Sequence, residues 1–137
     1  MTTVNAKKGE LVELVNGLFS VKDLKGKTFG LAVGKNIKVL MAELKPLEDL
    51  SAPSEKFVEL AKEIHAIANA DTEESQAKID KLEEENKEIV ETRKSQLDVL
   101  KAAMEEDSSV ELHTVPEEDL PEDITADQIN NIDKIII

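Results

Sequence analysis

The two histidines, His65 and His113, are the side chains best suited to metal or acid–base chemistry in this sequence. A metal site usually needs three or four convergent ligands, and neither histidine has a matched set of carboxylates or thiolates nearby in the chain. There is no cysteine, and no serine and histidine are arranged as a nucleophile and its base. Carboxylates are abundant, but no pair is singled out. We therefore expect no enzymatic activity, no cofactor, no metal and no small-molecule substrate.

Glycines near residue 30 suggest two further kinds of site. Gly26-Lys27-Thr28 matches the end of a phosphate-binding loop, but the full motif needs a glycine where Val21 stands and a buried strand before it. We expect no nucleotide binding. Gly26, Gly30 and Gly34 recur every four residues, so on a helix they would form a smooth strip for close helix packing. The alternative is a flexible start to that helix.

Charge is distributed unevenly along the chain. The net charge is −13; residues 1–47 carry eight lysines and four acids, whereas the rest carries nine bases and 26 acids. Without a basic stripe that releases counterions, we expect no binding to nucleic acid or membrane. The acidic runs 83–85 and 105–123 are interpreted as solvated faces and loops, with mimicry of nucleic-acid charge as the alternative. The basic N-terminal third could meet an acidic region of this chain or of a neighbouring copy.

The apolar residues suit a narrow seam between helices better than a thick core. The only aromatic residues are Phe19, Phe29 and Phe57, and charged residues make up 34% of the chain. No apolar run approaches the ~18 residues of a membrane-spanning helix. The first residues also lack the apolar stretch of a signal peptide.

Helical spacing of apolar residues predicts a short helix over 9–21 and two longer helical segments. A turn over 22–27 leads to Thr28, the expected N-cap of a helix over 28–69. Pro46 or Pro53 should kink or break this helix between 45 and 54. Asp71 or Thr72 should cap a second long helix over 72–106. Its apolar seam is weaker, because Asn86 and Arg93 interrupt it.

The last 31 residues have a different pattern. Alternating apolar and polar residues predict a strand over 110–115, and residues 116–123 should form an acidic loop. Thr125 and Gln128 form a capping box that predicts a final short helix. The terminal isoleucines should dock on this chain or on a partner, because apolar side chains avoid water.

Together these patterns predict a mainly α protein, a single elongated domain over 1–137. Its body is a long antiparallel, coiled-coil-like helical hairpin over 28–106. The N-terminal helix and turn occupy 1–27, and the strand, acidic loop and docking segment occupy 107–137. The expected seam residues are Val33, Ile37, Leu40, Leu44, Leu60, Ile64, Leu97 and Leu100. The expected docking residues are Ile132, Ile135 and Ile136.

Four segments in this order resemble a family of small uncharacterised proteins of tailed bacteriophages and prophages. They are GELVELVNGL, LKPLEDL, VELHTVPEEDLP and ITADQINNIDKII. The resemblance spans most of the chain and implies a phage context, but it supplies no catalytic residues.

Two functions follow as hypotheses. The first is a non-enzymatic structural or assembly protein of a phage head, neck or tail. It would act through helix packing with itself or with other virion proteins, first in the host cytoplasm and then in the virion. The alternative is a phage-encoded regulatory binder, either an assembly chaperone or an acidic inhibitor of a host protein.

Overall fold

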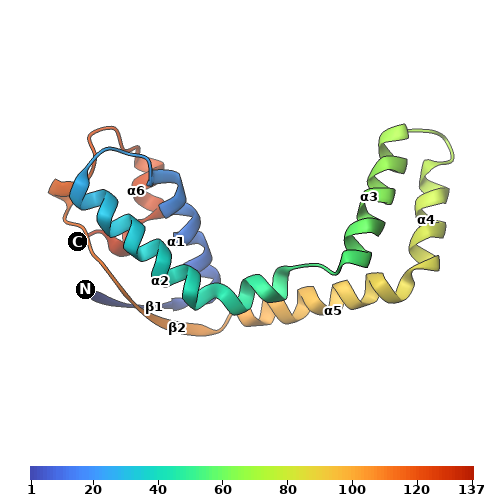
Figure 1. Ribbon diagram of the computed structural model, residues 1–137, viewed down its shortest axis with the longest axis horizontal. Helices are drawn as coiled ribbons and strands as arrows, with labels where there is room; N and C mark the ends of the chain where they lie inside the picture. The colour runs from blue at the N-terminus through green and yellow to red at the C-terminus, as the bar shows by residue number, and fades with distance from the viewer. The chain divides into compact units, whose positions relative to one another are not determined.

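The computed structural model describes all 137 residues and is mainly α-helical with one small antiparallel sheet (Figure 1). This confirms the predicted fold class. The chain groups into two compact units, and each is described by itself below. Unit 1 comprises Met1–Leu47 and Ala102–Ile137, and unit 2 comprises Glu48–Lys101. None of the helices combines the length and the apolar composition that crossing a bilayer requires. The elements in chain order are β1 (Thr2–Lys7), α1 (Lys8–Val21), α2 (Lys27–Ser51), α3 (Glu55–Ala70), α4 (Ser75–Glu85), α5 (Lys87–Met104), β2 (Asp107–Leu112), η1 (Glu117–Asp119), α6 (Ala126–Asn131) and η2 (Asp133–Ile135).

The sheet of unit 1 pairs β1 with β2, strands from distant parts of the sequence. The pairing is antiparallel and places Thr2 opposite Leu112 and Lys7 opposite Asp107. The predicted strand over 110–115 is therefore shifted by three residues towards the N-terminus. Strand β1 was not expected, because its partner lies far away in the sequence and its own residues are mostly polar.

The core of unit 1 is formed by the apolar faces of α1 and α2, the inner face of the sheet and the C-terminal segment. Helix α1 occupies nearly the range predicted for it. Helix α2 begins at Lys27, directly after Gly26 in a positive-φ conformation, so the prediction that Thr28 is the N-cap is wrong. The largest fully buried side chains include Phe29, Leu11, Leu14, Leu18, Leu40, Leu112, Ile132 and Ile135.

The first long helical segment breaks at Pro53 and not at Pro46. Pro46 lies inside α2, which continues to Ser51. Residues 52–54 are non-helical, and the hydroxyl of Ser54 accepts a hydrogen bond of 3.2 Å from the amide of Phe57. Serine at this position satisfies an unpaired amide of the first turn, so a new helix starts immediately after the proline.

In unit 2, α3 and α4 pack side by side and form the helical hairpin (Figure 1). Asp71 ends α3 in a left-handed conformation with φ 46°, and α4 begins only at Ser75. The prediction that Asp71 or Thr72 caps the second helix is therefore wrong. The hydroxyl of Ser75 instead accepts a hydrogen bond from the amide of Thr72 and donates one to the carbonyl of Ile67, which joins the ends of the two helices.

The second predicted helix, 72–106, is two helices separated at Asn86. The Asn86 side-chain amide donates a 2.9 Å hydrogen bond to the carbonyl of Leu82. An asparagine that bonds to the preceding turn competes with the helical hydrogen-bond pattern, which accounts for the break. Two polar side chains further along α5 bind the backbone of residues 51–52. Arg93 donates to the carbonyl of Ser51 and Gln96 to that of Ala52.

Candidate interaction surfaces

The predicted seam residues are divided between the two units. Val33, Leu40 and Leu44 are buried in unit 1, and Ile37 is half-buried there. Unit 2 buries Leu60, while Ile64 and Leu100 are half-buried. Leu97 is 43% exposed, so no part of this chain covers it fully. The sequence could not separate these cases, because helical periodicity identifies the apolar face of a helix but not the surface that covers it.

The terminal isoleucines pack within unit 1. Ile132 and Ile135 are fully buried, and Ile136 is half-buried. The amide of Val115 donates a 2.7 Å hydrogen bond to the carbonyl of Ile135, and the amide of Ile137 donates a 3.0 Å bond to the carbonyl of Val115. The tail therefore continues the chain's own core and is not a free docking element.

Asn36 is a buried polar residue that the sequence analysis did not single out. Its side chain is 0% exposed. Its Nδ2 donates to the carbonyl oxygen of His113 at 2.8 Å, and its Oδ1 accepts from the amide of His113 at 2.7 Å. One amide thus satisfies both backbone groups of the residue that follows β2. The spacing in the sequence did indicate that Asn36 is buried. Position 36 falls three residues after Val33 and four before Leu40, on the buried face of α2.

A close helix approach occurs at a different glycine from those predicted. A Cβ at Gly30 or Gly34 would have no neighbour within 4 Å, so no packing partner within the chain uses that strip. A Cβ at Gly17 would lie 2.7 Å from the carbonyl oxygen of Asn131, which is shorter than real Cβ contacts. Only glycine therefore permits the observed packing of α1 against α6.

One side of α2 exposes cationic and apolar residues together. Lys27, Leu31, Lys35, Lys38 and Met41 recur at helical spacing, and Leu31 and Met41 are 56% and 46% exposed. We call this set the α2 outer face. The nearby acid Glu43 is directed elsewhere, since its carboxylate accepts a 2.7 Å hydrogen bond from Ser108. The α2 outer face is therefore a cationic surface on a chain whose net charge is −13.

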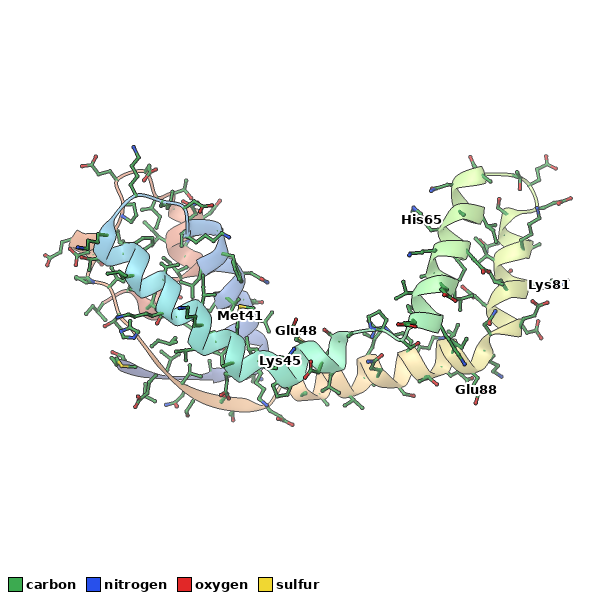
Figure 2. The ribbon with its side chains drawn as sticks, viewed as in Figure 1. Met41, Lys45, Glu48, His65, Lys81 and Glu88 are labelled. Atoms are coloured by element: carbon green, nitrogen blue, oxygen red, sulfur yellow. The ribbon has the colours of Figure 1, made fainter.

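A shallow, mainly apolar groove of about 570 Å³ lies along α3, and Figure 2 shows one of its residues, His65, on the side of α3 away from α4. Arg93 covers part of one aromatic ring beside it, with its guanidinium 5.6 Å from the centre of Phe57. We call this feature the α3 groove. It is lined by Pro53, Phe57, Val58, Ala61, Lys62, His65, Ala66 and Asn69.

Neither histidine takes part in a cluster of chemical groups. No group of three or more histidine, aspartate or glutamate side chains is placed to hold a metal ion. The clearest electrostatic effect is structural. The hydrogen bond from Lys7 to Glu105, 2.9 Å long, and the negative charge of that carboxylate raise the pKa of Lys7.

Comparisons with known proteins supply no relative for the chain. No protein-family model, no curated protein and no solved structure matches it.

Proposed function

We propose that this chain is a non-enzymatic structural or assembly protein of a bacteriophage, a small component of the virion head, neck or tail. It acts by packing helices against other subunits, which are further copies of itself or other virion proteins. It is made in the host cytoplasm and then enters the particle. The phage context is supported by the four sequence segments that resemble phage proteins.

The observation that carries the proposal is the incomplete core of unit 2. Across Glu48–Lys101, Leu60 is the only buried apolar side chain. Phe57, Ile64, Ile67 and Leu82 are only half-buried. Small helical units bury too little surface to gain much stability alone, so contact with another subunit would add substantially to the stability of this one. Exposed apolar strips on α2 and α3 support the same function, since such patches are typical of protein-binding surfaces.

The test is the composition of purified particles from the phage or prophage that encodes the chain. We expect a constant number of copies per particle by quantitative mass spectrometry, retained after washing in about 1 M salt, where exposed ion pairs are screened. Deleting the coding sequence should lower the yield of complete particles. Absence from particles, together with an unchanged particle yield on deletion, would refute the proposal. Salt-sensitive recovery with a basic host protein would instead support the regulatory binder.

A further inference from the structure

The α2 outer face carries a more specific conclusion about one subunit contact. We propose that it binds residues 117–123, which we call the acidic segment, of a second copy of this chain. Each copy then uses one surface to hold the next copy and a different surface to be held, so the association is head to tail. This inference rests on the proposed function, and it names a contact separate from the uncovered core of unit 2.

The cations of the α2 outer face have no partner within the chain. Lys27, Lys35 and Lys38 are exposed, and none of them forms an ion pair. Residues 24–42 contain no acid, so no neighbouring turn of the helix neutralises these charges. Leu31 lies among the lysines and is 56% exposed. The face therefore presents positive charge around an apolar centre.

The acidic segment presents the opposite charge around a similar centre. Leu120 is half-buried, and the buried Pro121 beside it anchors the segment to unit 1 before any partner binds. No lysine or arginine occurs between residues 102 and 133. The acids around Leu120 are exposed and form no ion pair; they are Glu117, Glu118, Asp119, Glu122 and Asp123.

The two surfaces also match in spacing. Leu31 has a lysine four residues before it and another four residues after it, each about 6 Å away along the helix axis. Leu120 has a glutamate two residues before it and another two residues after it, each at most about 7 Å away. When Leu31 of one copy meets Leu120 of the next, both glutamates therefore come opposite both lysines.

Other surfaces of the chain fit the α2 outer face less well. Two α2 outer faces would set lysines against lysines. The acidic run 83–85 has a lysine on either side, and Lys81 already pairs with Glu85 and Lys87 with Glu91. Within one copy no ion pair joins the α2 outer face to the acidic segment, and the core of unit 1 holds both in place. A second copy must therefore supply the acids.

The expected affinity is low. Exposed ion pairs contribute little individually, and each copy has a net charge of −13 that repels the other. We expect a dissociation constant on the order of 0.1 mM. A contact of this strength is useful inside a particle, where neighbouring copies are held at about millimolar effective concentration.

The first experiment is sedimentation equilibrium of the full chain at up to about 1 mM. Reversing two lysines, with Lys27→Glu and Lys35→Glu together, should weaken self-association by about tenfold or more. The matched control is Lys94→Glu with Lys101→Glu, two exposed lysines of α5. Both double variants have a net charge of −17, so general repulsion affects them equally. Equal affinities for the two would overturn the proposal.

The reciprocal variant, Glu118→Lys with Glu122→Lys, separates docking from general repulsion. Its net charge is only −9, so reduced repulsion alone would strengthen association. Docking of the acidic segment predicts the opposite, a loss of about tenfold or more. Mixing this variant with the Lys27→Glu and Lys35→Glu variant should restore association to within about threefold of the wild type, because each copy then meets a complementary surface. Thermal melts should match the wild type, since all four side chains are exposed.

The second experiment is disulfide crosslinking, which tests the head-to-tail geometry in a chain without native cysteine. A mixture of Leu31→Cys and Leu120→Cys variants at about 0.1 mM each should form mixed dimers at least about tenfold faster than either variant forms dimers with itself. Only the mixed pair brings its thiols within disulfide distance. The control replaces Leu31→Cys with Val99→Cys, at an exposed side chain of α5. A mixed rate no higher than that of the control would overturn the proposed contact.

A wild-type chain that stays monomeric at every concentration, or variants that fail to associate when mixed, would also overturn it. These outcomes are separate from those of the virion test. A chain that is monomeric in solution but present in particles refutes the head-to-tail contact and leaves the assembly function standing. A chain that associates as described but is absent from particles, with an unchanged particle yield on deletion, does the reverse.

Discussion

Units 1 and 2 are built from similar amphipathic helices, but they bury them very differently. Unit 1 contains 17 of the 18 buried apolar side chains, and unit 2 contains the remaining one, Leu60. In unit 1 helix α1 contacts β1 and α6, and the buried face of α2 binds the backbone of His113 through Asn36. In unit 2 the hairpin of α3 and α4 leaves much of each helix in contact with water. Amphipathic periodicity therefore does not make a core unless a further layer of structure covers the apolar face.

Removing residues 132–137 should have the largest effect on stability, because it takes away part of the well-packed core that distinguishes unit 1 from unit 2. The deletion takes away two fully buried isoleucines, and each buried isoleucine contributes about 2–5 kcal/mol. That loss is comparable with the total stability of a typical domain, so unit 1 should lose its fixed tertiary structure. Methyl NMR spectra and thermal melts measure this. The control is Ile137→Ala, at an exposed side chain, which should melt like the wild type.

Asn36→Leu should be the next most damaging change. It leaves the amide and carbonyl of His113 without their partner, and an unsatisfied buried polar group costs about 1–3 kcal/mol. We expect a loss of about 2–4 kcal/mol in urea unfolding. Asn16→Leu, on the exposed side of α1, is the matched control. Equal stability of the two variants would contradict the structural role of Asn36.

Leu60→Ala tests unit 2 directly. We expect a loss of about 2 kcal/mol, at the lower end for a buried leucine, because the neighbours of Leu60 are themselves half-exposed. Hydrogen exchange should accelerate in α3 and α4 and stay unchanged in α1. A comparable acceleration throughout unit 1 would mean that the two units do not differ in the way described.

A pair of glycine substitutions should give effects of opposite sign. Gly17→Ala forces a Cβ against Asn131, and overpacking of about 1–3 kcal/mol exceeds the gain in helix propensity. Gly34→Ala meets open space, so it should stabilise α2 by about 0.5–1 kcal/mol. Thermal melts of the two variants should shift in opposite directions. Shifts of the same sign would contradict the close approach of α1 and α6.

The smallest expected effect concerns Lys7 at high pH. Its pKa is raised by Glu105, so its contribution to stability is complete below about pH 10.5 and is lost as the pH rises through the raised value. Between pH 9 and 11.5, the melting temperature of the wild type should therefore fall slightly more than that of Lys7→Met. Parallel curves for the two proteins would show that the ion pair contributes nothing.

Local signals in the sequence predicted much of the fold. Helical spacing identified α1 and the apolar face of α2, and Thr125 and Gln128 correctly marked the start of α6 with a capping box. The proline at 53 was one of two stated positions for a break. These features depend on residues within one or two helical turns, so a single sequence contains the information.

The features that were missed depend on distant partners or on competition within one turn. Strand β1 exists because β2 pairs with it, and the close approach at Gly17 exists because α6 packs there. Asn86 was interpreted as a polar seam residue, yet its side chain interrupts the helix. The exposed surfaces of α2 and α3 were predicted only in part. The sequence suggested helix packing with other subunits, but it could not show which faces of α2 and α3 stay uncovered.

The pairing of β1 with β2 also sets an order of events during synthesis. Residues 1–47 reach the solvent before residues 102–137, which supply their sheet partner and five of the 17 buried apolar side chains of unit 1. At about 5–20 residues per second, the N-terminal segment waits several seconds with its leucines exposed. The hairpin of α3 and α4, whose contacts are local, can form in the meantime. The better-packed unit of the molecule is therefore the last to fold, and this interval is when a nascent chain would most need protection from aggregation.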